Sequence, residues 1–236
     1  MCRIYLDIET LPSMAAGAIE TVRAGIKPPA NYKKPETIAA WMAAEGEAAA
    51  DAAWRKQALD GAAGELVAVG FADDDSEPVS LVRRTTEDEG DFIRRALAGI
   101  QALIEKWAIV DAGGQSWPAG DPFFIGHCIT FDLGFLARRC WVHGVEAPFP
   151  LPFAGRTGRD FGDTMTLWTG SPREYISLDR LCRALGIDSP KAACDGAEVL
   201  QWWQGEDLDR IRRYNADDVR ACRQVWHRLT WWGKAA

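Results

Sequence analysis

The first residues of the chain alternate apolar and polar side chains with a period of two, which is the pattern of a β-strand. In the segment RIYLDIET, one face would carry Ile4, Leu6 and Ile8, and the opposite face would carry Asp7 and Glu9. Carboxylates that crowd together in a fold repel one another and lose hydration unless cations hold them. The alternative is a strand end that faces solvent, where acidic pairs are common. The segment predicts an opening strand with an acidic pair at its carboxyl end.

The later segments predict a sheet surrounded by helices, of mixed α/β or α+β class. Strands are expected at 64–72, 79–84 and 122–128, the first two as a hairpin, and helices at 87–107, from Asp132 onward, and at 177–187, 196–203 and 207–232. The Ala-rich stretch 35–59 predicts two helices, because Gly46 interrupts it. The segments 12–34, 111–121 and 144–162 are expected to be irregular.

The chain has 236 residues, enough to bury a sizeable core, and shows no internal repeat or low-complexity linker. A single domain over 1–236 is therefore expected, with an inserted helical segment at about 12–62.

The composition, with 47% hydrophobic and 26% charged residues, is that of an ordinary globular protein. A formal charge of −7 argues against a generic nucleic-acid coat protein, but not against an enzyme that acts on nucleic acid. Six scattered cysteines without a CxxC pair predict reduced thiols, not a zinc site or a disulfide framework. With no leader and no apolar run of membrane-spanning length in the sequence, we expect a cytoplasmic protein without a membrane partner.

Two further acids stand where a core would place apolar residues. Asp132 lies at a predicted strand-to-helix junction, where an acid can serve the helix N-terminus and where open α/β sheets also place active groups. Asp218 falls inside the apolar stripe of the last predicted helix, where an acid is costly without a partner. Tyr214 stands one turn earlier on the same side, whereas Asp217 points away and is expected to be solvated.

In this order, LDIET, GHCITFDLGFLARR and YNADD resemble the three motifs of the DEDD superfamily of 3′→5′ exonucleases, in the branch whose third motif is Tyr-x-x-x-Asp. The similarity covers residues 3–11 and about 64–229, and it points to stand-alone, phage-like exonucleases related to the proofreading domain of family-B DNA polymerases. The resemblance implies a ribonuclease-H-like α/β fold: a mixed sheet of about five strands flanked by helices, with a helical insertion after the first strand. Cys128 departs from the pattern, because such families often have Asn there, and a Cys cannot supply the hydrogen bonds of that amide.

The resemblance also implies a catalytic set, made of Asp7, Glu9, Asp132, Tyr214 and Asp218. Its four carboxylates would hold two divalent cations, Mg²⁺ or Mn²⁺, which suit ligands that are all oxygen. Asp7 would bridge both ions, Glu9 and Asp218 would hold the ion that activates water, and Asp132 would hold the other. Tyr214 would orient the attacking water or help to deprotonate it.

Seven residues are expected to contact nucleic acid. The resemblance implies that Thr10 and Leu11 approach the terminal nucleotide, and Phe131, beside Asp132, is assigned to the same group. Basic residues in long loops are the better candidates for phosphate contacts, although most such charges are simply solvated: Lys33, Lys34, Arg156 and Arg159.

We therefore expect a 3′→5′ exonuclease that hydrolyses single-stranded DNA to nucleoside 5′-monophosphates. Two alternatives stay open: a 3′→5′ exoribonuclease that trims RNA with the same residues, and a non-catalytic nucleic-acid-binding module. The expected partner is single-stranded nucleic acid, with a polymerase or recombination protein only as a separate chain.

Overall fold

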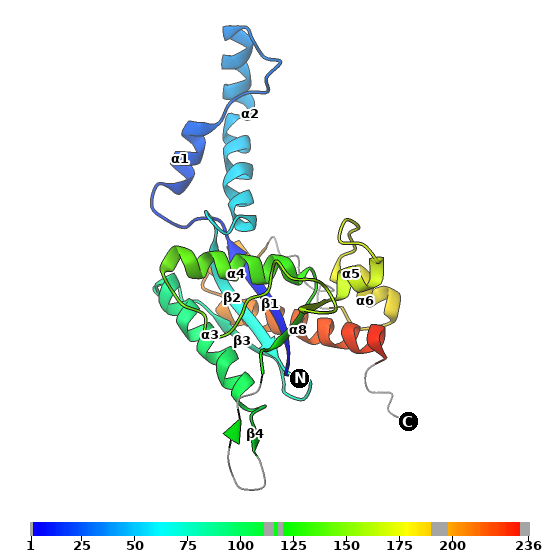
Figure 1. The fold of residues 1–236 in the computed structure, drawn as a ribbon. Helices are drawn as coiled ribbons and strands as arrows, with labels where there is room; N and C mark the ends of the chain where they lie inside the picture. The colour runs from blue at the N-terminus through cyan, green and yellow to red at the C-terminus, as the bar shows by residue number, and fades with distance from the viewer. Residues whose placement is uncertain (1, 111–115, 118–119, 190–197, 232–236) are drawn as a thin grey trace. The chain divides into compact units, whose positions relative to one another are not determined.

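The computed structural model describes residues 2–110, 116–117, 120–189 and 198–231 (Figure 1). Its backbone divides into two compact units: a sheet unit, made of Met1–Glu9 and Leu66–Ala236, and a helical unit, Thr10–Glu65. The helical unit corresponds to the insertion expected at about 12–62. That both units form a single domain stays a prediction.

The sheet of the first unit contains both parallel and antiparallel pairs. The strands are, in chain order, β1 (Arg3–Leu11), β2 (Glu65–Ala72), β3 (Val79–Val82), β4 (Ile109–Val110), β5 (Ser116–Trp117), β6 (Phe123–Gly126) and β7 (Phe161–Asp163). The main sheet has five strands in the order β3-β2-β1-β6-β7, with β6 parallel to both β1 and β7 and β2 antiparallel to β3. The short strands β4 and β5 form an antiparallel pair of their own. This architecture confirms the expected mixed sheet of about five strands.

Helices flank the sheet. The sheet unit contains α3 (Glu89–Glu105), α4 (Ile129–His143), α5 (Thr164–Thr169), α6 (Leu178–Leu185), α7 (Val199–Gln204) and α8 (Leu208–Thr230), and the helical unit contains α1 (Ala18–Gly25), α2 (Pro35–Lys56) and the 3₁₀ turn η1 (Gln57–Leu59). Side-chain caps fix several of their starts: Asp88 accepts from the N–H groups of Gly90 and Asp91 before α3, for example. Within the described ranges, no helix combines the length and apolarity needed to span a bilayer.

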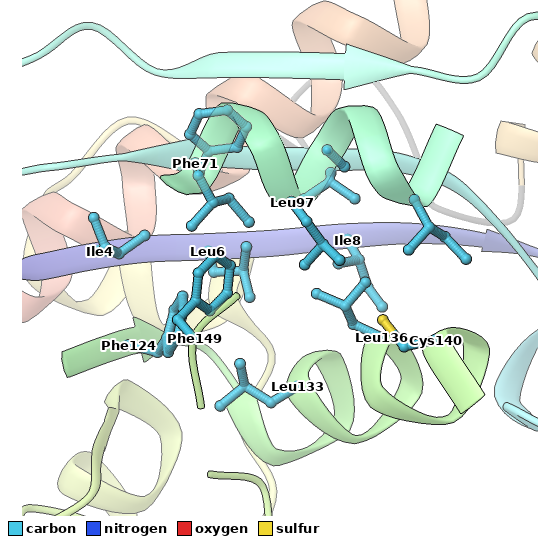
Figure 2. Close-up of a cluster of buried hydrophobic side chains, with 14 of the residues drawn as sticks. Ile4, Leu6, Ile8, Phe71, Leu97, Phe124, Leu133, Leu136, Cys140 and Phe149 are labelled. Carbon is cyan, nitrogen blue, oxygen red and sulfur yellow. The ribbon is translucent and has the colours of Figure 1, made fainter. Parts of the chain in front are cut away.

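The two faces of β1 pack against different helices. Ile4, Leu6 and Ile8 are buried in the main core with side chains of α3 and α4 (Figure 2). On the opposite face, Tyr5 packs with Val219 of α8 in a second cluster. The alternation in the sequence therefore separates the core face of β1 from a face that is directed at α8.

The break predicted at Gly46 was wrong, because α2 runs without interruption from Pro35 to Lys56. Gly46 is buried, and α1 packs along α2 with an ion pair between Arg23 and Glu47. A glycine inside a helix costs only about 1 kcal/mol relative to alanine, which such packing offsets.

Some segments expected to be irregular also contain regular structure. They hold α1, β5 and the first two residues of β7, and α5 follows directly on β7. β7 is three residues long and joins the sheet through pairs such as Phe124 with Phe161 and Gly126 with Asp163. Such a strand is too short for a period of two to reveal it.

Replacing Gly46 by alanine tests whether α2 is continuous. Gly46→Ala should raise the free energy of unfolding by about 0.5–1 kcal/mol, because alanine favours the helix and restricts the unfolded chain. The new Cβ would lie 3.4 Å from the flexible end of the Met42 side chain, which leaves room for it. Denaturant unfolding followed by circular dichroism measures the change. Ala48→Gly, at an exposed position of the same helix, should cost a similar amount. Unchanged or lower stability of Gly46→Ala would contradict an unbroken helix.

Candidate active site

The acidic face of β1 is directed at α8. Asp7 is half-buried, and the side-chain amide of Asn215 donates a 2.8 Å hydrogen bond to Asp7 Oδ2. The same amide donates to the backbone carbonyl of Asp7 at 3.2 Å. Glu9, two residues further along the strand, is also half-buried. β1 therefore presents both carboxylates beside the last helix, as the period of a strand requires.

Asp218 of α8 completes a group of three carboxylates. Asp7, Glu9 and Asp218 each offer an oxygen atom, and these atoms all lie within 4.8 Å of one another. Asp218 is buried, with only 6% of its surface exposed, whereas the neighbouring Asp217 is half-buried and pairs with Arg220. Oxygen ligands at such spacing suit Mg²⁺ or Mn²⁺. Residues that are far apart in the sequence thus meet in a geometry that fits a divalent cation.

Asp132 reaches the same region from the first turn of α4. It is 5% exposed, and its Oδ1 accepts a hydrogen bond from the backbone N–H of Ile8 at 3.2 Å. Ile8 lies between Asp7 and Glu9 in β1, so this bond ties Asp132 to the strand that carries the acidic pair. Asp132 is not one of the three residues whose carboxylate oxygens lie within 4.8 Å of one another.

The carboxylates raise one another's pKa. Burial among protein atoms is the largest cause that raises the pKa of Asp7, although part of its side chain is accessible, and the charges of Asp218, Asp132 and Glu9 raise it further. The hydrogen bond from Asn215 acts in the opposite direction. Burial also raises the pKa of Asp132, against the hydrogen bond from Ile8. Such a site favours a cation, because a positive charge would offset both the lost hydration and the repulsion.

Tyr214 lies one turn before Asp218 on α8 and is buried. Burial and the charges of Glu9, Asp218 and Asp7 raise the pKa of its phenol above its usual range, as does a hydrogen bond with Asp218. The ring packs edge-on against Trp202 of α7, with 5.6 Å between the ring centroids. These contacts hold a protonated hydroxyl next to the acidic group.

Asp163, at the end of β7, is a supporting residue that the motif analysis missed. It is 2% exposed, and its carboxylate accepts hydrogen bonds from the backbone N–H groups of Cys128, Ile129 and Thr166. One side chain therefore caps α5 and also fixes the backbone at the start of α4, which carries Asp132. An Asp directly before a Thr-rich helix start, in GDTMT, is the sequence signal that could have found it.

Cys128 occupies a backbone position with φ 64°, in the left-handed region. Asn adopts this conformation more readily than most residues, so the Asn that the resemblance implies at this position would suit the backbone. Cys128 keeps the turn and its N–H still donates to Asp163. It is one of five described free thiols, with Cys2, Cys140, Cys182 and Cys222, whereas Cys194 lies outside the described residues.

The residues expected to bind nucleic acid are placed as follows. Phe131, in the first turn of α4, is half-buried and packs against Phe135. In the helical unit, Leu11 is fully buried, Thr10 donates its hydroxyl to the carbonyl of Ala58, and Lys33 and Lys34 are exposed. Arg156 and Arg159 are exposed in the sheet unit, and Arg159 pairs with Asp160. Contacts of these residues with nucleic acid stay predictions.

Comparisons with known proteins bear on this site. Residues 152–233, which contain Tyr214 and Asp218, match a family model described as "Predicted 3'-5' exonuclease related to the exonuclease domain of PolB". The family B DNA polymerase from the hyperthermophilic archaeon Pyrobaculum calidifontis has a similar structure, with a TM-score of 0.57 at 15% sequence identity. This match covers 98% of the present chain and 24% of the polymerase chain. No curated protein matches the chain.

These matches confirm the resemblance to exonucleases related to the exonuclease domain of family-B polymerases. The family match indicates the enzyme class, which is a hydrolase of the 3′→5′ exonuclease type. The match to the polymerase has a low sequence identity, so it supports the fold alone.

Neutralising Asp7 should stabilise the metal-free protein at pH 8. Because folding raises the pKa of Asp7, the wild-type chain loses stability as the pH rises from about 4 through the raised pKa. Asp7→Asn removes this loss and can still accept the hydrogen bond from Asn215 through its carbonyl oxygen. We expect a gain of about 1 kcal/mol or more in chelator at pH 8, or about 2–4 °C in Tm, and a much smaller difference near pH 4.

Asp160→Asn is the control for this measurement. Hydrogen bonds from Arg159 lower the pKa of Asp160 to about 2, so its neutralisation should not raise the Tm at pH 8. An Asp7→Asn protein that melts at or below the wild-type temperature in chelator at pH 8 would contradict the raised pKa.

Proposed function

We propose that the chain is a divalent-metal-dependent 3′→5′ exonuclease that hydrolyses single-stranded DNA and releases nucleoside 5′-monophosphates. The observation that carries this proposal is the meeting of Asp7, Glu9 and Asp218 within 4.8 Å. The exonuclease family model matches the segment that supplies Asp218 and Tyr214. The sheet unit brings the two acids of β1 to that segment.

The proposed metal ligands are the four carboxylates. Asp7, Glu9 and Asp218 would hold one divalent cation, and Asp7 and Asp132 would hold a second. When bound, such ions stabilise the attacking and leaving oxygens of a phosphodiester. The donors are all carboxylate oxygens, which favours Mg²⁺ or Mn²⁺ over softer metals. The raised pKa values of Asp7 and Asp132 support this assignment, because both carboxylates are held in surroundings that penalise their charge.

Tyr214 is proposed to orient the attacking water. Because the pKa of its phenol is raised, the hydroxyl stays protonated at neutral pH and acts as a hydrogen-bond partner instead of a base. The hydrogen bond with Asp218 and the packing against Trp202 hold it in place. Positioning is therefore the role that its surroundings favour, and deprotonation is the less suitable of the two roles expected for it.

The proposed substrate is DNA because the related exonuclease domains belong to DNA polymerases. Arg156 and Arg159 of the sheet unit, and Lys33 and Lys34 of the helical unit, are proposed to contact phosphates. Arg159 would have to exchange its ion pair with Asp160 for a phosphate, so Arg156 is the better candidate of the two. A polymerase or recombination protein on a separate chain is proposed as a protein partner.

Removal of Asp7 should abolish cleavage without unfolding the protein. Asp7→Ala deletes a ligand proposed for both ions, and we expect a loss of about 10³-fold or more in the rate of shortening of a 5′-labelled single strand with Mg²⁺. Circular dichroism should remain that of the wild-type protein. Asp217→Ala is the matched control, since this acid lies on α8 next to Asp218 but pairs with Arg220, and it should leave the rate nearly unchanged. Wild-type rates for Asp7→Ala would reject the mechanism.

The substrate class is tested with paired oligonucleotides. Labelled DNA and RNA strands of the same sequence should both be offered to the wild-type protein, with faster release of nucleoside monophosphates from the DNA. Product analysis distinguishes 3′→5′ removal from internal cutting, because only the former gives a ladder that shortens from the 3′ end. Preferred digestion of the RNA strand would replace the proposed substrate with RNA. Binding of both strands without digestion of either would support a non-catalytic module.

A further inference from the structure

Asn215 is a completely buried amide beside the acidic group. It has no exposed surface, and it lies on α8 between Tyr214 and Asp218. A buried amide is costly unless its donors and its acceptor are all used. Its hydrogen bonds therefore indicate what this position does.

Both ends of the Asn215 amide have partners in the sheet. The Nδ2 atom donates to Asp7 Oδ2 at 2.8 Å and to the Asp7 carbonyl at 3.2 Å. The Oδ1 atom accepts a 2.6 Å hydrogen bond from the hydroxyl of Ser80 on β3. Ser80 is itself buried, and its bond to Asn215 spans 135 positions of the sequence. The amide thus links β3 to Asp7 on β1.

Gly70 of β2 gives the amide the space that it needs. Gly70 pairs with Ser80 in the β2–β3 ladder, and β2 lies between β3 and β1 in the sheet. A Cβ atom at residue 70 would lie 2.5 Å from Asn215 Oδ1 and 2.9 Å from a methyl group of Val219. A side chain on Gly70 would therefore displace the amide from its position between Ser80 and Asp7.

The carboxylate and the carbonyl of Asp7 accept hydrogen bonds, so the NH₂ group of the amide faces Asp7 and its oxygen faces Ser80. A hydroxyl that donates to Oδ1 keeps the oxygen on the side of β3 and the NH₂ group on the side of the carboxylate. The opposite orientation would place the amide oxygen against a carboxylate oxygen, which is repulsive. Because the amide holds Asp7 Oδ2, the orientation of the carboxylate about the Cβ–Cγ bond is fixed.

We propose that Ser80, acting through Asn215, is a positioning residue that sets the orientation of the Asp7 carboxylate for metal binding. The proposal rests on the proposed function in one respect, the assignment of Asp7 as a metal ligand. Groups that orient a ligand through hydrogen bonds typically change metal affinity by about 10- to 100-fold when they are removed. Neither Ser80 nor Asn215 needs to touch the ion or the substrate.

The test is a titration of the substrate-free protein with Mn²⁺, followed by the electron paramagnetic resonance signal of the free ion. Ser80→Ala should weaken Mn²⁺ binding by about 10-fold, and Ser80→Thr, which keeps the hydroxyl donor, should restore it to near the wild-type value. Cleavage of single-stranded DNA by Ser80→Ala should recover as Mn²⁺ is raised to saturation, because the ligands themselves are intact.

Val82→Ala is the matched control, because Val82 is a buried residue of the same strand two positions from Ser80. It should lower the Tm in chelator and leave the Mn²⁺ affinity unchanged. Wild-type affinity in Ser80→Ala, or an equal loss in Val82→Ala, would overturn the positioning role and reduce Ser80 to a structural residue.

The outcomes separate the two proposals. Wild-type protein that binds Mn²⁺ but cleaves no nucleic acid would overturn the exonuclease function, while a 10-fold weaker affinity of Ser80→Ala would still support the positioning role. Wild-type protein that cleaves DNA, together with unchanged Mn²⁺ binding by Ser80→Ala, would overturn the positioning role alone. Absence of Mn²⁺ binding by the wild-type protein would overturn both.

Discussion

Burial of several carboxylates in one region, together with their mutual repulsion, is the main electrostatic cost of this structure. Besides burial, which has the largest effect, the charges of Asp218, Asp132 and Glu9 raise the pKa of Asp7, and that of Asp218 raises the pKa of Asp132. The surrounding chain supplies neutral donors, the N–H group of Ile8 for Asp132 and the amide of Asn215 for Asp7. Neutral donors stabilise a carboxylate without cancelling its charge. A divalent cation would offset both the lost hydration and the repulsion, and this is the physical basis of the metal-assisted hydrolysis that we propose.

The position of β1, which carries Asp7 and Glu9, is fixed by packing on both of its faces. The apolar face of β1 is fixed in the core with α3 and α4 (Figure 2), and its other face packs against α8. Asp163 adds a second constraint, because a single buried carboxylate organises the starts of α4 and α5. Rigid elements placed in this way suit a site whose ligands must keep a fixed spacing. The helical unit is a compact body of its own and contributes none of the four carboxylates.

The family match and the geometry of the site support different parts of the proposed function. The exonuclease family model matches residues 152–233, which include Tyr214 and Asp218 but neither acid of β1. The structure brings Asp7 and Glu9 to Asp218, and so extends the acidic set beyond the matched segment. The likeness to a DNA polymerase covers 24% of that polymerase chain at 15% identity, and a shared fold alone does not specify a reaction. The proximity of Asp7, Glu9 and Asp218 therefore supports the proposed function more strongly than the fold does.

Neighbouring residues predict the alternation of β1 and the stripe of α8 with Asp218 inside it, but they leave the class open between α/β and α+β. Periodicity specifies which side chains share a face of one element, so these features could be recognised from neighbouring residues. The packing of the elements brings Asn215 to Asp7 across 208 positions and Ser80 to the same amide, and it lets Asp163 of a three-residue strand accept hydrogen bonds from the first turns of α4 and α5. These contacts depend on how α8 packs on the sheet and on which strands become neighbours. No pattern within a single segment records that information.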